Sequence, residues 1–82
     1  MTNALKAILT QVKAERFFFK AASHEERDLS DFQSIVNGLK HLYSEGLLED
    51  FVTHEESHTG HDWVDAVCVG KLTAKGEALL EE

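Results

Sequence analysis

The chain has 82 residues, 43% of them hydrophobic, and its fifteen acidic side chains outnumber its eight Lys and Arg residues to give a formal net charge of −7. This length can bury one modest core, so we expect a single domain over residues 1–82 and no second domain. No apolar run approaches the roughly 20 residues that span a membrane, and the N-terminal residues lack a secretory signal, so we expect a cytoplasmic protein with no membrane partner.

The N-terminal quarter predicts a helix and then a short strand. Apolar residues recur at spacings of three and four, as on one face of a helix: Ala4, Leu5, Ile8, Leu9 and Val12. Arg16–Lys20 is short and aromatic enough for one strand. Three consecutive rings, Phe17, Phe18 and Phe19, cannot all point inward from a strand, so we expect at least one at the surface or in an interface.

Two helix-start signals follow. Ser23 and Ser30 are each followed three residues later by Glu or Gln, the pattern in which both side chains satisfy free amide groups at a helix N-terminus. We therefore expect a short helix over residues 24–29, a sharp turn, and a longer helix over residues 31–45. Together these would form a helix-turn-helix.

The longer helix has one apolar face and one polar face. Six residues are expected on the apolar, buried face: Phe32, Ile35, Val36, Leu39, Leu42 and Tyr43. Gly46 follows where a left-handed residue commonly ends a helix. Gly38 lies inside the helix, where it costs about 1 kcal/mol relative to alanine, and a close contact with another helix would explain it.

The second half predicts a hairpin and a last short helix. Residues 47–53 and 63–69 are rich in β-branched and aromatic side chains, and the polar residues 54–62 separate them, which indicates two strands joined by a long tip. Cys68 is the only cysteine, so it cannot form an internal disulfide, and we expect it to be a small buried residue. Thr73 can cap the last helix.

Two short motifs carry a resemblance to a known family. The first contains Leu39, Leu42, Gly46, Leu47 and Leu48, and the second contains Leu72, Thr73, Ala74, Lys75, Gly76 and Leu79. With these motifs and this order of elements, the chain resembles the winged helix-turn-helix superfamily, and the second motif is similar to the ending of many bacterial and phage members. The resemblance implies an α+β fold with a three-helix core, a short strand, a two-stranded hairpin wing and a short C-terminal helix.

The resemblance also implies DNA binding and a transcriptional-regulator-like role, although winged helices serve RNA binding and protein docking as well. Residues on and near the longer helix are expected to contact duplex DNA: Gln33, Ser34, Asn37, Lys40 and His41, with Lys20 and Arg27. A homodimer would join two such surfaces over a longer DNA site.

The distribution of charge favours a different partner. Residues 1–40 contain six basic and five acidic side chains, whereas residues 41–82 contain two and ten, and the expected wing tip has no Lys or Arg. Such a wing repels phosphates at neutral pH. The alternative is a protein-docking module with an acidic wing, of the kind that a phage or mobile element would use to modulate a host protein. Its contact residues would be Phe17, Phe18, Phe19, Glu55, Glu56, Asp62 and Trp63.

The wing tip also contains a match to the H-E-x-x-H pattern, from His54 to His58. Zinc proteases need this motif on a stable helix, and here strand residues precede it and Thr59-Gly60 follow it, so we expect no protease. His54, His58 and His61 are weak candidates for metal ligands. No phosphate-binding loop or nucleophile motif is present, so we expect no enzyme activity and no cofactor.

Overall fold

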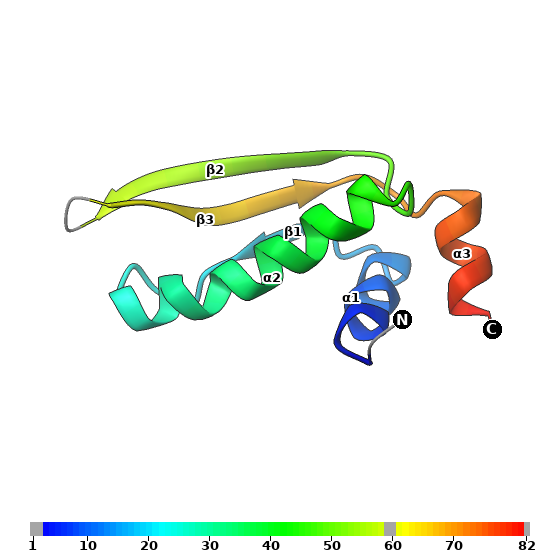
Figure 1. The fold of residues 1–82 in the computed structure, drawn as a ribbon, viewed down its shortest axis with the longest axis horizontal. Helices are drawn as coiled ribbons and strands as arrows, with labels where there is room; N and C mark the ends of the chain where they lie inside the picture. The colour runs from blue at the N-terminus through cyan, green and yellow to red at the C-terminus, as the bar shows by residue number, and fades with distance from the viewer. Residues whose placement is uncertain (1–2, 59–60, 82) are drawn as a thin grey trace.

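The computed structural model of the chain describes residues 3–58 and 61–81 (Figure 1). In chain order, the elements of these residues are α1 (Asn3–Lys13), β1 (Phe18–Lys20), α2 (Glu26–Ser44), β2 (Phe51–His58), β3 (His61–Val69) and α3 (Ala74–Leu80). The strands pair antiparallel in the order β1-β3-β2, so β3 is central and β2 is an edge strand. The expected α+β class is confirmed. Among the described residues, no helix is both long and apolar enough to cross a membrane.

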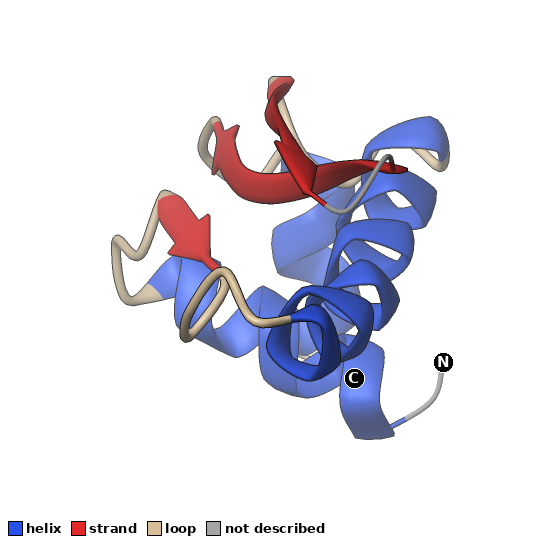
Figure 2. Ribbon diagram, turned by 90° about the vertical axis from the view of Figure 1, so that its left-hand side faces the viewer, coloured by secondary structure: helices blue, strands red, loops and turns tan. Residues whose placement is uncertain are grey.

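The helices and the sheet form two layers (Figures 1 and 2). Phe19, Val67 and Val69 extend from one face of the sheet into the core, where side chains of α1 and α2 meet them. Each large apolar side chain buried there contributes about 1.5–3 kcal/mol relative to its exposed state. The other buried hydrophobic residues are Leu9, Val12, Ala21, Leu29, Phe32, Val36, Leu39, Leu42, Leu47 and Leu48.

One continuous helix, α2, replaces the two helices expected over residues 24–29 and 31–45, so the helix-turn-helix prediction is wrong. The N-cap expected at Ser23 is also wrong, because the N-cap of α2 is Glu25, which has no side-chain capping bond. Ser23 lies two residues earlier, and its Oγ accepts a hydrogen bond from the Glu25 amide at 3.1 Å. Ser30 instead lies well inside the helix. A stripe of buried residues continues through that position, and burying it outweighs an N-cap, which stabilises by only about 1 kcal/mol. The stripe consists of Leu29, Phe32, Val36, Leu39 and Leu42.

The buried face of α2 is narrower than the sequence predicts. Ile35 and Tyr43, both expected in the core, are 40% and 45% exposed, and the Tyr43 ring stacks on Phe51 with 5.9 Å between ring centroids. The expected close contact at Gly38 is confirmed. A Cβ at Gly38 would lie 3.2 Å from Ile8 Cδ1 of α1, so the absence of a side chain lets the two helices approach.

The hairpin strands lie closer to the tip than expected, because β2 begins at Phe51 instead of residue 47 and both strands continue into the polar segment. The polar residues 54–58 belong to β2, and β3 already begins at His61, so the prediction of a long tip over residues 54–62 is wrong. Main-chain pairing continues through Ser57 opposite Asp62. Polar side chains do not oppose this pairing, because backbone groups make the ladder and an exposed edge strand need not be apolar.

The last helix begins as the sequence predicts. Thr73 is the N-cap of α3, and its Oγ1 accepts a hydrogen bond from the Gly76 amide at 3.1 Å. The same hydroxyl donates to the Gly46 carbonyl at 2.6 Å, and Lys75 Nζ donates to the Glu45 carbonyl at 2.9 Å. These bonds attach the start of α3 to the end of α2 and satisfy carbonyl groups that a helix C-terminus leaves free.

Candidate functional site

Asp65 is the buried charged residue among the described residues, with 9% of its surface exposed. It occupies an irregular position in β3. His54 pairs with Ala66 and the next residue of β2, Glu55, pairs with Val64, so Asp65 is an extra residue without a partner in the ladder. Such a bulge redirects a side chain away from its regular position.

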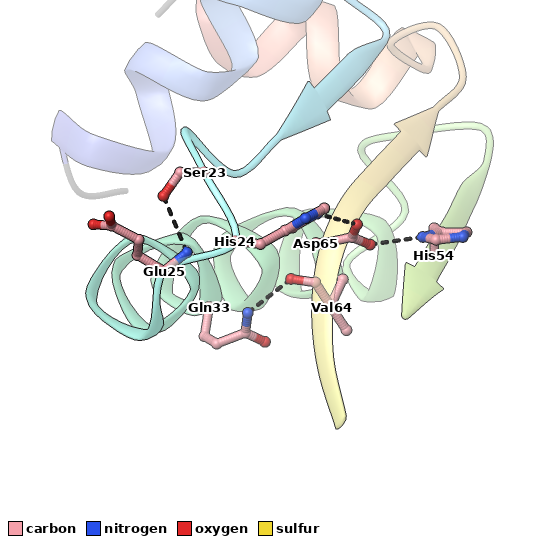
Figure 3. Close-up of polar contacts among 7 residues, drawn as sticks. All are labelled: Ser23, His24, Glu25, Gln33, His54, Val64 and Asp65. Atoms are coloured by element: carbon pink, nitrogen blue, oxygen red, sulfur yellow. Dashed lines mark hydrogen bonds and ion pairs between the residues drawn. The ribbon is translucent and has the colours of Figure 1, made fainter. Parts of the chain in front are cut away.

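The Asp65 carboxylate lies between two imidazoles that come from different parts of the chain (Figure 3). Its Oδ1 is 2.7 Å from His54 Nδ1 of β2, and its Oδ2 is 3.2 Å from His24 Nε2, in the segment between β1 and α2. Both histidine side chains are more than 60% exposed. The cluster therefore has a fixed, buried carboxylate at its base and two imidazoles that face solvent.

The main chain around the bulge is held from both sides. The Ala21 amide donates to the Asp65 carbonyl at 2.8 Å and extends the β1 contact beyond the strand. Gln33 of α2 donates through Nε2 to the Val64 carbonyl at 2.8 Å and to the Leu29 carbonyl at 2.9 Å (Figure 3). Gln33, which the sequence places among the DNA-contacting residues, is thus engaged within the fold.

Asp65 and His54 change each other's affinity for protons. The hydrogen bond from His54, together with a weaker one from His24, holds the pKa of Asp65 below its usual 3.8, although burial opposes this shift. The hydrogen bond and the negative charge of Asp65 raise the pKa of His54 above its usual 6.5. At mildly acidic pH, the pair is therefore an imidazolium beside a carboxylate.

Glu56 extends the cluster along β2. One ligand atom each from His54, Glu56 and Asp65 can be chosen so that all three lie within 4.8 Å of one another. His54 and Glu56 are two residues apart in a strand, so they point to the same face of the sheet. Imidazole nitrogen and carboxylate oxygen are ligands of Zn²⁺ and related ions.

An apolar row crosses the same face of the sheet. Phe18 of β1 pairs with Cys68 of β3, and Cys68 pairs with Val52 of β2, so the three side chains are neighbours on one face. Phe18 is 54% exposed and Val52 is 64% exposed. Cys68 is exposed as well, so its expected burial is wrong. Its neighbours in β3, Val67 and Val69, face the core, and strand alternation turns Cys68 the other way.

The three consecutive phenylalanines, Phe17, Phe18 and Phe19, differ in exposure. Phe19 is buried, Phe17 is half-buried and Phe18 is exposed, which confirms that at least one ring lies at the surface. The Arg16 guanidinium lies over the Phe19 ring, 4.4 Å from its centroid. Of the other residues expected to contact a protein, Glu55, Glu56 and Asp62 are exposed, and Trp63 is half-buried and packs against the core.

The residues expected to contact DNA lie on two elements, α2 and β1. Ser34, Asn37 and His41 are exposed and share a face of α2 at spacings of three and four. Lys20 lies on the sheet, on a different element. The other two residues expected to contact DNA, Lys40 and Arg27, are also exposed. The Nε atom of Arg27 is 3.9 Å from the Asp28 carboxylate.

The structure brings only one of the three candidate metal-ligating histidines, His54, into the cluster. The side chains of His58 and His61 lie outside the described residues. The H-E-x-x-H residues lie in β2, where positions four apart are separated by about 13 Å, so they do not form the helical zinc motif. Sequence reasoning missed Asp65 and His24, whose long-range approach has no local signal.

Comparisons with known proteins add no family assignment. No family model matches the chain, and no curated protein or solved structure shows significant similarity to it.

Proposed function

We propose that this chain is a non-enzymatic protein-docking module that binds an extended, basic segment of a partner along β2 and the adjoining outer face of the sheet. We define the outer face as the one that carries the row of Phe18, Cys68 and Val52. The main support for this function is that the exposed apolar row lies on the same sheet as a hairpin rich in acidic side chains. We further propose that the fold is a winged-helix variant in which the single helix α2 replaces the helix-turn-helix, supported by the order of β1, α2, hairpin and α3 and by the Leu72–Gly76 ending.

The apolar row supplies the hydrophobic part of such a contact. The inner face of the sheet is covered by helices, whereas Phe18 and Val52 keep more than half of their surfaces exposed. Single exposed apolar residues are ordinary, but three in line across three strands form a continuous patch. A partner that covers this row would gain roughly 25 cal/mol for each Å² of apolar surface removed from water.

The edge strand supplies the directional part of the contact. β2 is eight residues long and has β3 on one side only, so main-chain groups on its other side are available to a further strand. Peptides that add to a sheet edge gain affinity from these main-chain bonds and specificity from side chains on alternate faces. The apolar row begins at Val52 on this same strand.

Charge selects a basic occupant. Residues 41–70 contain seven acidic side chains and no Lys or Arg, and Glu55 and Glu56 lie on β2 itself. Two copies of β2 that paired edge to edge would bring these carboxylates together, which disfavours a second copy of the chain as the occupant. A strand with Lys or Arg on both faces would instead meet an opposite charge on each face.

DNA binding is the second candidate, favoured by the exposed face of α2 that carries Ser34, Asn37 and His41. The first turns of α2 also carry three carboxylates, Glu26, Asp28 and Asp31, against one arginine in that part of the helix. This local charge weakens contact with phosphates. A duplex and a basic strand therefore predict different contact residues on the same molecule.

A residue-resolved NMR titration of the labelled chain distinguishes the two partners. One titrant is a short peptide of repeated valine-valine-lysine-lysine, which places lysine on both faces of a strand, and the other is a generic DNA duplex, both at low salt. We expect the peptide to shift amides of β2 and the residues of the apolar row. Duplex-induced shifts confined to residues 30–44, with no response to the peptide, would show DNA binding instead.

Charge variants test the role of the acidic hairpin. Neutralising Glu55, Glu56 and Asp62 together is expected to weaken peptide binding about tenfold, since exposed ion pairs contribute about 0.2–1 kcal/mol each. The matched control neutralises Glu25, Glu26 and Glu77, which are exposed outside the hairpin and change the net charge equally. Equal weakening by both triple variants would indicate attraction to the overall negative charge and refute a site on the hairpin.

A further inference from the structure

We propose that His54, Glu56 and Asp65 bind a divalent transition-metal ion of the zinc type, with His24 as a positioning residue for Asp65. This site stands on its own geometry and does not depend on the proposed docking function. Its ligands come from both strands of the hairpin, and its base is the bulge in β3. The site differs from the one expected at the wing tip, because it uses neither His58 nor His61.

The separations are short enough for one ion. The three ligand atoms lie within 4.8 Å of one another, and two ligands of a tetrahedral zinc ion are about 3.4 Å apart, given bonds of about 2.0–2.2 Å. His54 Nδ1 and Asp65 Oδ1 are now 2.7 Å apart, so they would separate by about 0.7 Å to admit the ion in place of the shared proton. His54 and Glu56 are exposed, so their side chains can make this adjustment.

Asp65 is held in position by neighbouring residues before any metal ion binds. The Ala21 amide holds its carbonyl, and the Gln33 amide group holds the carbonyl of the preceding residue. His24 contacts the second carboxylate oxygen at 3.2 Å and thereby leaves Oδ1 turned toward His54. A carboxylate held in this way loses little conformational freedom on binding, and such supporting contacts typically change metal affinity 10–100-fold.

The donor set selects the class of ion. One imidazole and two carboxylates suit Zn²⁺, Co²⁺ and Ni²⁺, whereas Mg²⁺ and Ca²⁺ prefer oxygen ligands alone and Cu⁺ prefers sulfur. Three protein ligands leave a fourth position to solvent. Lys20 of β1 is in register with this row of the sheet, since it pairs with Ala66, which in turn pairs with His54.

Zinc titration of the chelator-treated chain by calorimetry tests the site, with circular dichroism to confirm that each variant is folded. We expect one ion per chain. His54→Ala and Glu56→Gln should each weaken binding at least tenfold, because each removes a direct ligand. Glu55→Gln is the matched control. It removes the neighbouring exposed carboxylate, which points to the opposite face of β2, and should leave the affinity unchanged.

A double variant, His58→Gln with His61→Gln, separates the cluster from the wing tip. Retention of zinc binding in this variant supports the cluster. Loss of binding there, with retention in Glu56→Gln and His54→Ala, overturns the proposed site, as does the absence of saturable binding in the wild-type chain. Glu56→Gln and His54→Ala test the proposed site even if Asp65→Asn fails to fold, because both change exposed side chains.

Variants at His24 test the positioning role. His24→Ala should weaken zinc binding about tenfold without changing the number of ions bound. His24→Gln should restore the affinity, since the glutamine Nε2 can donate to Asp65 from nearly the same place as the imidazole Nε2. Weakening by both variants, while His54 and Glu56 signals still shift on zinc addition as in the wild type, would assign His24 as a ligand instead of a positioning residue.

Discussion

The two faces of the sheet use similar residues for opposite purposes. On the inner face, Phe19 and Val67 are almost completely buried beneath the helices, whereas their counterparts on the outer face, Phe18 and Val52, are mostly exposed. Phe18 and Phe19 are neighbours in β1, so the difference arises from strand alternation and not from residue type. The inner face stabilises the fold, and the outer face is available for binding.

The largest expected difference between the faces is in stability. Phe19→Ala should lower the free energy of unfolding by about 3–5 kcal/mol, because it removes a buried ring and leaves a cavity in the core. Phe18→Ala removes the same atoms from an exposed position and should cost less than about 1 kcal/mol. Chemical denaturation of both variants measures the difference. Equal losses would mean that the outer face is covered in the protein and would contradict the comparison.

Thiol chemistry measures the same difference with a smaller change in core packing than the removal of a ring. Cys68 is exposed, so it should react with an aromatic disulfide reagent in the native chain. In the double variant Val67→Cys with Cys68→Ser, the only thiol is on the inner face, at a position 1% exposed in the wild type. Its reaction should be about 100-fold slower, since it requires an opening of the structure. A reaction as fast as that of Cys68 would show that the inner face is not closed.

The smallest expected effect comes from the polar cluster on the outer face. The pKa of His54 is raised, so its pairing with Asp65 stabilises the fold fully below the unfolded value of 6.5, and this contribution is lost as pH rises through the folded pKa. The pKa of Asp65 is lowered, so its contribution is present above 3.8 and is lost as pH falls through the folded pKa. The pair therefore contributes most between about pH 4 and 6.5.

His54→Asn tests this dependence, because asparagine keeps a hydrogen-bond donor near Asp65 but carries no charge. With a chelator present, the stability difference between wild type and variant should be larger at pH 5.5 than at pH 8.5. A difference that is constant or grows with pH would contradict the ion pair.

Local patterns in the sequence predict the parts of the fold that depend on near neighbours. Thr73 caps α3 and Gly38 permits a close helix contact, as expected. The cap expected at Ser30 is wrong because a buried stripe extends through it, so the packing of the whole helix overrides a local signal. The expected burial of Cys68 rests on its residue type alone and is wrong. The strand alternation of Val67 and Val69 on either side of it predicts its exposure.

The site depends on contacts that local patterns cannot predict. The 2.7 Å approach of His54 to Asp65 requires the bulge, which shifts the pairing of one strand by a single residue. His24 reaches the same carboxylate from a segment 41 positions earlier in the chain. A one-residue change in register decides which face a strand side chain occupies, and no residue in the sequence marks this bulge.

The junction between α2 and α3 has a consequence for the order of folding. Its bonds join residues 45–49 to residues 71–75, including a bridge between Leu48 and Leu72, and the chain between them contains the whole hairpin. Closing this long loop costs less entropy once the hairpin has brought its ends together. We therefore expect β2 and β3 to pair early in refolding and α3 to be the last helix to pack onto the core. On unfolding, α3 should be the first helix to detach.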